Sequence, residues 1–211
     1  VSFDENVDFS NMTAGSFDEI DQIRFAGSSK TGTFTGAQLT GETLLLTETG
    51  GGTNKLVINV GSGTTATFTN ITASTFDNGS DTITINGVDG GNETITGPNL
   101  DSSIVGGSGD DDLTGGSAND TIEGGDGNDI LNGGGGTTNT LTYVNAGAAV
   151  TVDISNTSQQ NTIGAGLDTI SNFNTLTGSN HNDTLTGNGN VNTINGGDGD
   201  DTINGNGGSD T

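Results

Sequence analysis

Single aliphatic residues recur at nine-residue intervals through the second half of the chain. Each stands in a three-residue run such as 112–114 (DLT), and six-residue segments rich in Gly, Asn and Asp separate these runs. Thr and Ile favour short strands, and Gly favours turns because it adopts left-handed backbone angles without steric cost. The pattern predicts one minimal strand and one turn per nine residues, in two series: Leu113, Ile122 and Leu131, preceded by Ile95 and Ile104; and Leu185, Ile194 and Ile203, preceded by Leu176.

The first part of the chain is less regular. Residues 44–71 alternate apolar and polar side chains, as half-buried strands do, and Gly-rich segments separate the expected strands. No amphipathic helix of useful length is predicted anywhere. Residues 1–80 could therefore continue a stack of strands or form a small β-sandwich packed against it, and continuation is the simpler reading.

The repeats group into two blocks. Units 106–114, 115–123 and 124–132 are followed by a degraded unit from Gly133, and units 178–186, 187–195 and 196–204 are followed by the partial unit 205–211. Two units would make one coil with a strand on each side and a turn at each end, and coils would stack at about 4.8 Å, the usual strand spacing. The predicted fold class is all-β, a parallel β-roll or β-solenoid of nine-residue Gly-Asp-rich repeats.

We therefore expect four regions along the chain. Residues 1–80 are a strand-rich region that continues the solenoid or packs on it, 81–141 the first repeat block, 142–176 a spacer and 177–211 a truncated second block. Because the chain begins with Val1 and stops inside a repeat, we expect it to be a fragment of a longer protein.

The net charge of the chain limits the kinds of molecule that it is expected to bind. The formal net charge is −24, and the three basic residues, Arg24, Lys30 and Lys55, all lie within the first 55 residues. Nucleic acid and anionic membrane surfaces are not expected as partners because both are bound through Lys and Arg. No run approaches the length of a membrane span, and without Cys no disulfide or thiolate metal site can form. Self-repulsion on this scale calls for bound counter-ions.

Carboxylates share the period of the aliphatic residues and stand two residues before them. If alternate turns stack, Asp111 and Asp129 face one gap, and Asp120 faces the degraded turn at Thr138 or Asn139. In the second block Asp183 would face Asp201, and Asn192 would face Asp210. Repelling carboxylates beside Gly-rich turns that offer carbonyl groups form an oxygen-only site, which suits Ca²⁺ with its roughly six to eight oxygen ligands and not Zn²⁺, Cu²⁺ or Fe.

The predicted ligands are the sixth-position carboxylates and the residues of the turns that carry them, through their carbonyl groups. They are Gly106, Gly107, Ser108, Gly109, Asp111, Gly115, Gly116, Ser117, Asp120, Gly124, Gly125, Asp126, Gly127, Asp129, Gly178, Asn180, Asp183, Gly196, Gly197, Asp198, Gly199, Asp201 and Asp210. A metal-free solenoid whose acids are merely solvated would explain Asp-rich turns. It would explain neither the fixed two-residue offset nor the absence of Lys and Arg after Lys55.

The pattern G-G-x-G-x-D-x-U-x in residues 106–132 and 196–204 resembles the RTX, or haemolysin-type, calcium-binding repeat. Residues 141–187 look like the spacers between RTX blocks, and 68–97 is similar to segments that precede RTX arrays in very large secreted bacterial proteins. The resemblance implies a parallel β-roll, Ca²⁺-dependent folding, and export from a bacterium by a type I secretion system to the extracellular space or cell surface.

Several units depart from this pattern. Ala118 replaces a turn Gly, Ser179 and His181 alter the turn of 178–186, Asn192 replaces the Asp, and the unit from Gly133 has an extra residue and no Asp. We expect about two strong ions, at Asp111/Asp129 and Asp183/Asp201, and about two to four weaker ones.

Catalysis is not expected within this chain. A Ser-His-Asp arrangement would have to use His181, the only histidine, and no HExxH motif is present. The expected function is a secreted calcium-binding module, structural in a large adhesin, filament or surface layer, with possible self-association through β edges. The alternative is an accessory calcium domain of a secreted enzyme or toxin. The acidic pairs Asp4-Glu5 and Asp18-Glu19 suit a solvated surface or extra metal binding.

Overall fold

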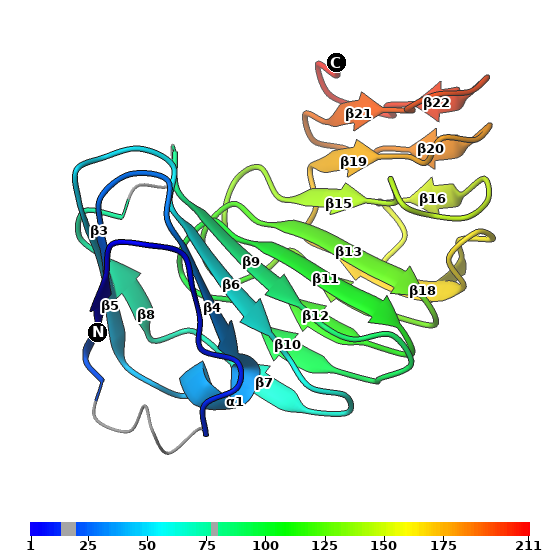
Figure 1. Ribbon diagram of the computed structural model, residues 1–211. Helices are drawn as coiled ribbons and strands as arrows, with labels where there is room; N and C mark the ends of the chain where they lie inside the picture. The colour runs from blue at the N-terminus through cyan, green and yellow to red at the C-terminus, as the bar shows by residue number, and fades with distance from the viewer. Residues whose placement is uncertain (14–19, 77–79) are drawn as a thin grey trace.

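The computed structural model describes residues 1–13, 20–76 and 80–211, whose strands stack into one elongated solenoid (Figure 1). Of the two acidic pairs, Asp4 and Glu5 are exposed, and Asp18-Glu19 lies outside the described residues. Neighbouring strands are parallel except β17 (Gln160–Asn161), which pairs antiparallel with β18 (Leu167–Ser171). The predicted parallel β-solenoid is confirmed.

One sheet runs the length of the molecule and joins all four expected regions. Among the described residues it has nine strands, in the order β2 (Val7–Asp8), β4 (Thr31–Thr35), β6 (Lys55–Asn59), β9 (Thr82–Asn86), β11 (Ser103–Ser108), β13 (Thr121–Asp126), β15 (Thr140–Thr142), β19 (Thr175–Thr177) and β21 (Thr193–Asn195). Because this sheet passes without a break from β6 to β9 and β11, residues 1–80 continue the solenoid and do not form a separate sandwich.

The N-terminal coils are wide. Paired residues in successive coils are 22 to 27 residues apart, from Ser2 and Arg24 at one extreme to Asn59 and Asn86 at the other. The central sheet is joined there by a second sheet of β1 (Ser2–Phe3), β3 (Gln22–Ala26), β5 (Leu44–Thr49) and β8 (Ile71–Ala73). The third side is formed first by the short helix α1 (Gly36–Leu39) and then by β7 (Thr65–Thr67). After β8 the second sheet ends and the coil becomes two-sided.

The narrow coils have the predicted repeat of 18 residues. The strand opposite the central sheet belongs to a six-stranded sheet, β7, β10 (Thr94–Thr96), β12 (Asp112–Thr114), β14 (Ile130–Asn132), β18 and β17. The register pairs Ile95 with Leu113 and Leu113 with Leu131, so the nine-residue aliphatic series becomes two facing ladders. In the second block a three-stranded sheet takes this place, with β16 (Thr151–Asp153) from the spacer, β20 (Thr184–Thr186) and β22 (Thr202–Asn204).

The predicted spacer is itself part of the stack. Its strand β18 pairs with β14 of the first block, whereas β16 pairs with β20 of the second block. The chain therefore leaves β15, contributes a strand to the second block, turns back through β17 to complete the first block, and then enters β19. Residues 142–176 hold the two blocks in one solenoid because each block depends on a spacer strand.

The core changes in character along the stack. Phe25, Phe34 and Phe68 fill the wide coils without exposure, and Phe34 also stacks on Phe9 with ring centroids 4.8 Å apart. The narrow coils hold one aliphatic side chain per strand, and Leu113, Ile122, Leu131 and Leu185 are fully buried. Ile194 is only partly buried and Ile203 is 49% exposed, because their strands β21 and β22 are each paired on one side only.

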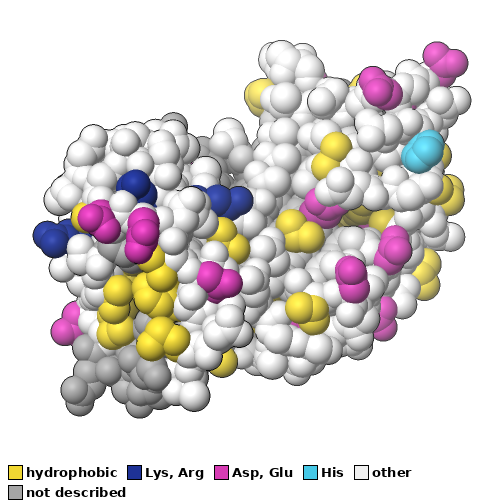
Figure 2. Space-filling view, in the orientation of Figure 1, with side chains coloured by type: hydrophobic (Ala, Val, Ile, Leu, Met, Phe, Trp, Pro, Cys, Tyr) yellow, Lys and Arg dark blue, Asp and Glu magenta, His cyan; other side chains and the backbone are white. Residues whose placement is uncertain are grey.

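Positive charge is confined to one part of the face shown in Figure 2. Lys and Arg lie on the wide N-terminal coils, whereas acidic groups are scattered over both the wide and the narrow coils. Among the described residues no helix is both long and apolar enough to cross a membrane.

Candidate metal centre

A ladder of four carboxylates runs along one edge of the narrow coils. The backbone N–H of Glu93 donates to Asp111 Oδ1 at 2.7 Å, that of Asp111 to Asp129 Oδ1 at 2.9 Å, and that of Asp129 to Asp168 Oδ1 at 3.1 Å. Each of these aspartates therefore uses its Oδ1 to accept a hydrogen bond from the preceding coil. The expected neighbours Asp111 and Asp129 lie in adjacent turns of this ladder.

The second oxygen of three repeat carboxylates is buried and has no hydrogen-bond partner. These atoms are Asp111 Oδ2, Asp120 Oδ2 and Asp129 Oδ2, and the three side chains are between 1 and 2% exposed. An anionic oxygen that is removed from water without a donor costs several kcal/mol unless a cation compensates it.

Carbonyl groups converge on the same places. A methyl group on Gly106 would collide with Asp111 Oδ2 and lie 2.5 Å from the carbonyl oxygen of Gly124 in the next coil. A methyl group on Gly115 would likewise lie 2.5 Å from Asp120 Oδ2 and 2.6 Å from the Gly133 carbonyl oxygen. Glycine is required at these positions because its missing side chain leaves the space between a carboxylate and a carbonyl.

These groups fit a calcium ion. Ca²⁺ takes hard oxygen ligands, with carboxylates and backbone carbonyls in flexible combinations. The described residues hold no group of three or more His, Cys, Asp or Glu suited to a metal, so carbonyls must supply most ligands of each gap. Ca²⁺ would neutralise the unpartnered oxygens, and Asp111, Asp129, Gly106 and Gly124 are the residues of this chain that would hold it.

Asparagine in the sixth position supplies an amide donor in place of a second carboxylate oxygen. Asn139 lies opposite Asp120, whose N–H donates to Asn139 Oδ1 at 3.0 Å. Its amide Nδ2 donates to the carbonyl oxygens of Asn172 and Gly135. In the same way Asn192 Nδ2 donates to the Asn174 carbonyl at 3.1 Å. The amide group therefore satisfies carbonyls that would otherwise be free to bind a cation.

In the second block the residues expected to face each other do lie together, but the carboxylate oxygens of Asp183 have other hydrogen-bond partners. Asp183 and Asp201 are joined by an N–H···Oδ1 hydrogen bond of 2.9 Å, as are Asn192 and Asp210. Both oxygens of Asp183 already accept hydrogen bonds, from the N–H of Val150 and from the N–H and hydroxyl of Ser179. Ser179, which stands where other turns have Gly, donates to this carboxylate. Asp183 therefore has no unpartnered oxygen, unlike Asp111.

The remaining predicted ligands lie in the turns. The first glycine of each unit is buried between coils: Gly106, Gly115, Gly124, Gly178 and Gly196. Other residues of the turns present their side chains to solvent, so only their carbonyls would face a gap: Ser117, Asp126, Asn180 and Asp198. Gly107, Ser108, Gly109, Gly116, Gly125 and Gly127 are half-buried, and Gly197, Gly199 and Asp210 are exposed.

Glu93 and Asp168, the two ends of the ladder, are absent from the predicted ligand set. A signal for both is present in the sequence, since Glu93 stands two residues before Ile95 and Asp168 two residues before Ile170. The offset is the one that relates Asp111 to Leu113. A search at a fixed period misses this offset for two reasons. The residue two positions before Ile95 is Glu and not Asp, and Asp168 follows Asp129 at an interval of 39 residues and not 18.

Asp168 closes the ladder without an ion. Its Oδ2 accepts hydrogen bonds from the hydroxyl groups of Tyr143 and Thr162, both at 3.0 Å. Burial raises the pKa of Asp168, and the Tyr143 and Thr162 bonds act in the opposite direction. Burial and the nearby Asp168 raise the pKa of Tyr143 well above its usual value, so the phenol stays a donor. The spacer thus supplies two donors where a repeat would leave an oxygen unpartnered.

Burial also raises the pKa of the three carboxylates whose second oxygen has no hydrogen-bond partner. It raises the pKa of Asp111 and of Asp120 to about 6 and that of Asp129 to about 7, from 3.8. A raised pKa means that the folded chain binds protons more tightly than the unfolded chain. The stabilisation that this contributes is complete below pH 3.8 and is lost as pH rises through 6 to 7.

The calcium-free chain should therefore become less stable between pH 5 and pH 8. Thermal melts in calcium-free buffer at several pH values in this range would measure the trend. With saturating Ca²⁺ the trend should disappear or reverse, because protons then compete with the ion. A calcium-free melting temperature that is constant from pH 5 to pH 8 would contradict the burial of charged oxygens in these gaps.

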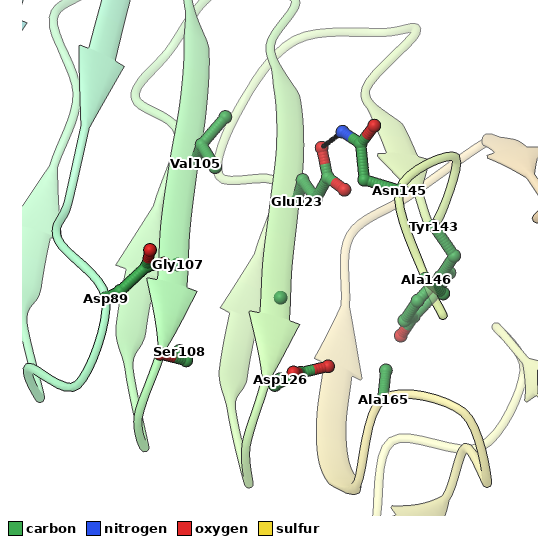
Figure 3. A pocket seen from close by; sticks show the side chains of 11 residues that line it. Asp89, Val105, Gly107, Ser108, Glu123, Asp126, Tyr143, Asn145, Ala146 and Ala165 are labelled. Atoms are coloured by element: carbon green, nitrogen blue, oxygen red, sulfur yellow. Dashed lines mark hydrogen bonds between the residues drawn. The ribbon is translucent and has the colours of Figure 1, made fainter. Parts of the chain in front are cut away.

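A hollow lies beside the ladder on the outer side of β11 and β13 (Figure 3). Tyr143, Asn145 and Ala146, from the segment after β15, cover one side of it. Its most buried carboxylate, Glu123, accepts a hydrogen bond from Asn145 Nδ2 at 2.9 Å. The hollow is the seam where the spacer packs on the central sheet. The single histidine, His181, lies far along the chain in an exposed turn.

Comparison with known proteins agrees with this geometry. The model of the RTX calcium-binding nonapeptide repeat matches residues 105–138 and 174–211, in four copies, which is about a third of the chain. No curated protein and no solved structure matches the chain. The matched segments contain the ladder residues Asp111 and Asp129 and the second-block pair Asp183 and Asp201. Residues 105–138 and 174–211 are therefore RTX calcium-binding nonapeptide repeats.

Proposed function

We propose that this chain is a secreted, non-catalytic calcium-binding module that folds when Ca²⁺ becomes available and serves as a structural part of a large bacterial extracellular or surface protein. RTX repeats are calcium-binding structural modules, and the finer role rests on the arrangement of charge. The observation that carries it is the row of buried, unpartnered oxygens of Asp111, Asp120 and Asp129 between stacked turns.

Binding and folding would be coupled through these oxygens. Without a cation, buried carboxylates and a core of one aliphatic side chain per strand give the stacked turns little stability, and low hydrophobicity with high net charge favours disorder. An ion that binds only the folded chain adds free energy of folding according to its concentration. Low calcium inside a cell would keep the chain unfolded for export, and higher calcium outside would fold it.

A structural role in an adhesin, filament or surface layer is favoured over an accessory domain of an enzyme or toxin. The observation behind this preference is that residues 1–80 extend the same central sheet and add no separate fold. Exposed strand edges in general support pairing with further β-strands, and we include self-association with a second copy in this proposal.

Counting bound ions would test the calcium sites directly. The full chain is dialysed against buffered Ca²⁺, and the bound metal is measured by atomic emission for the wild type and for Asp111→Asn. We expect several ions per chain and fewer in the variant, with Mg²⁺ unable to replace them. A wild type that retains no Ca²⁺ at millimolar concentration would refute the proposal.

A further inference from the structure

The turn that precedes the matched repeats has the same construction as the repeat turns. Residues 88–96 stack on 106–114, with Ile95 opposite Leu113, and place Glu93 at the position of Asp111. The Glu93 N–H donates to Asp111 Oδ1 and its carbonyl accepts the N–H of Asp112, both within 2.8 Å. Glu93 is therefore the first carboxylate of the ladder, although it lies outside residues 105–138.

The Glu93 side chain is directed inward. It is 1% exposed, and a methyl group on Gly87 would lie 2.9 Å from Glu93 Oε2 and collide with the carbonyl oxygen of Gly106. This repeats the relation of Gly106 to Asp111 Oδ2 and the Gly124 carbonyl. The longer Glu side chain suits the coil at this point, where β9 and β11 are offset by 19 residues, as Ile85 and Ile104 are, and not by 18.

The gap between the two turns contains an oxygen that is weakly hydrogen-bonded. Glu93 Oε2 has only a long contact of 3.4 Å with the Val88 N–H, although the Glu93 side chain is buried. Asp111 faces this gap through Oδ1, which accepts the Glu93 N–H, and its unpartnered Oδ2 lies beside the Gly124 carbonyl in the next gap. Glu93 Oε2 and the Gly106 carbonyl oxygen, both acceptors, thus lie around the same buried point beside Gly87.

We propose that the gap between the turns 87–93 and 106–111 is a further Ca²⁺ site, held by the carboxylates of Glu93 and Asp111 and by backbone carbonyls including that of Gly106. The inference rests on the proposed calcium-binding function and extends it beyond the matched repeats. Its particular consequence is for the wide coils, because Glu93 Oε1 accepts the N–H of Gly63 at 2.9 Å, in the turn before β7. An ion here would connect calcium binding to the N-terminal region.

The test compares Glu93→Gln with Glu42→Gln in the full chain. Both changes remove one Glu charge, but Glu42 is half-exposed and lies outside the ladder. The Glu93→Gln change keeps the size of the side chain and an acceptor for the Gly63 N–H. Bound calcium is counted by dialysis and atomic emission, and hydrogen exchange of residues 55–73 is followed with and without Ca²⁺.

We expect Glu93→Gln to bind one ion fewer than the wild type and to lose the calcium-induced protection of residues 55–73, while Glu42→Gln does neither. Glu93→Asp, which restores the carboxylate found in the repeats, should recover the ion. Equal ion counts and protection in the wild type and Glu93→Gln would overturn this site alone. A wild type that binds no calcium would instead overturn the proposed function itself.

Discussion

In calcium-free buffer at neutral pH, residues 1–211 should show a weak β signal in far-ultraviolet circular dichroism, and added Ca²⁺ should raise it cooperatively. The midpoint is expected on the order of 10⁻⁴–10⁻³ M, the range of extracellular calcium modules. The reason is the set of unpartnered oxygens of Asp111, Asp120 and Asp129, which oppose the stacking of turns until a cation lies between them. Cooperativity is expected because the central sheet links all coils.

Mg²⁺ provides the matched control for this titration. It demands octahedral geometry and loses its water reluctantly, so it should raise the signal little, and a chelator should reverse the effect of Ca²⁺. A chain that is fully β-structured in chelator and unchanged by Ca²⁺ would show that the solenoid is stable without metal. The nine-residue period would then be a matter of architecture alone.

The substitution Asp129→Asn should have opposite effects in the two states. Without calcium at pH 8 it should stabilise the fold by on the order of 1–3 kcal/mol, since it removes a buried unpartnered charge. The amide could donate to neighbouring carbonyls as Asn139 and Asn192 do. With calcium it should weaken binding by roughly 10- to 100-fold or more, because it removes a charged ligand. Urea melts in each condition measure both effects.

The same turn offers a control for this prediction. Asp126 lies three residues before Asp129 with an exposed side chain, so Asp126→Asn removes the same charge and should change neither stability by more than about 0.5 kcal/mol. Because the pKa of Asp129 is raised to about 7, the calcium-free advantage of Asp129→Asn should shrink toward pH 5. A variant that is destabilised in both conditions would mean that Asp129 acts through its hydrogen bond to Asp111 alone.

The sequence by itself determined the repeat, the fold class and the pairing of turns. A strict nine-residue period leaves one stacking that directs the repeated aliphatic residues to the inside, so Leu113 had to face Leu131, and Asp129 had to follow Asp111 in the next coil. The two-residue offset between acid and aliphatic residue sets the side of the strand on which each lies. Local spacing was sufficient because the contacts of a solenoid are between neighbours.

Only the tertiary structure decided what happens where the period breaks. The wide coils, with their third side at α1 and β7, depend on Phe25, Phe34 and Phe68 meeting across strands that share no fixed interval. The spacer contributes strands to both blocks, and Tyr143 and Thr162 meet Asp168 only because β18 returns to β14. Which carboxylate oxygens remain unpartnered also depends partly on the tertiary structure. Tyr143 and Val150 reach Asp168 and Asp183 from other segments, and no donor reaches the second oxygen of Asp111, Asp120 or Asp129.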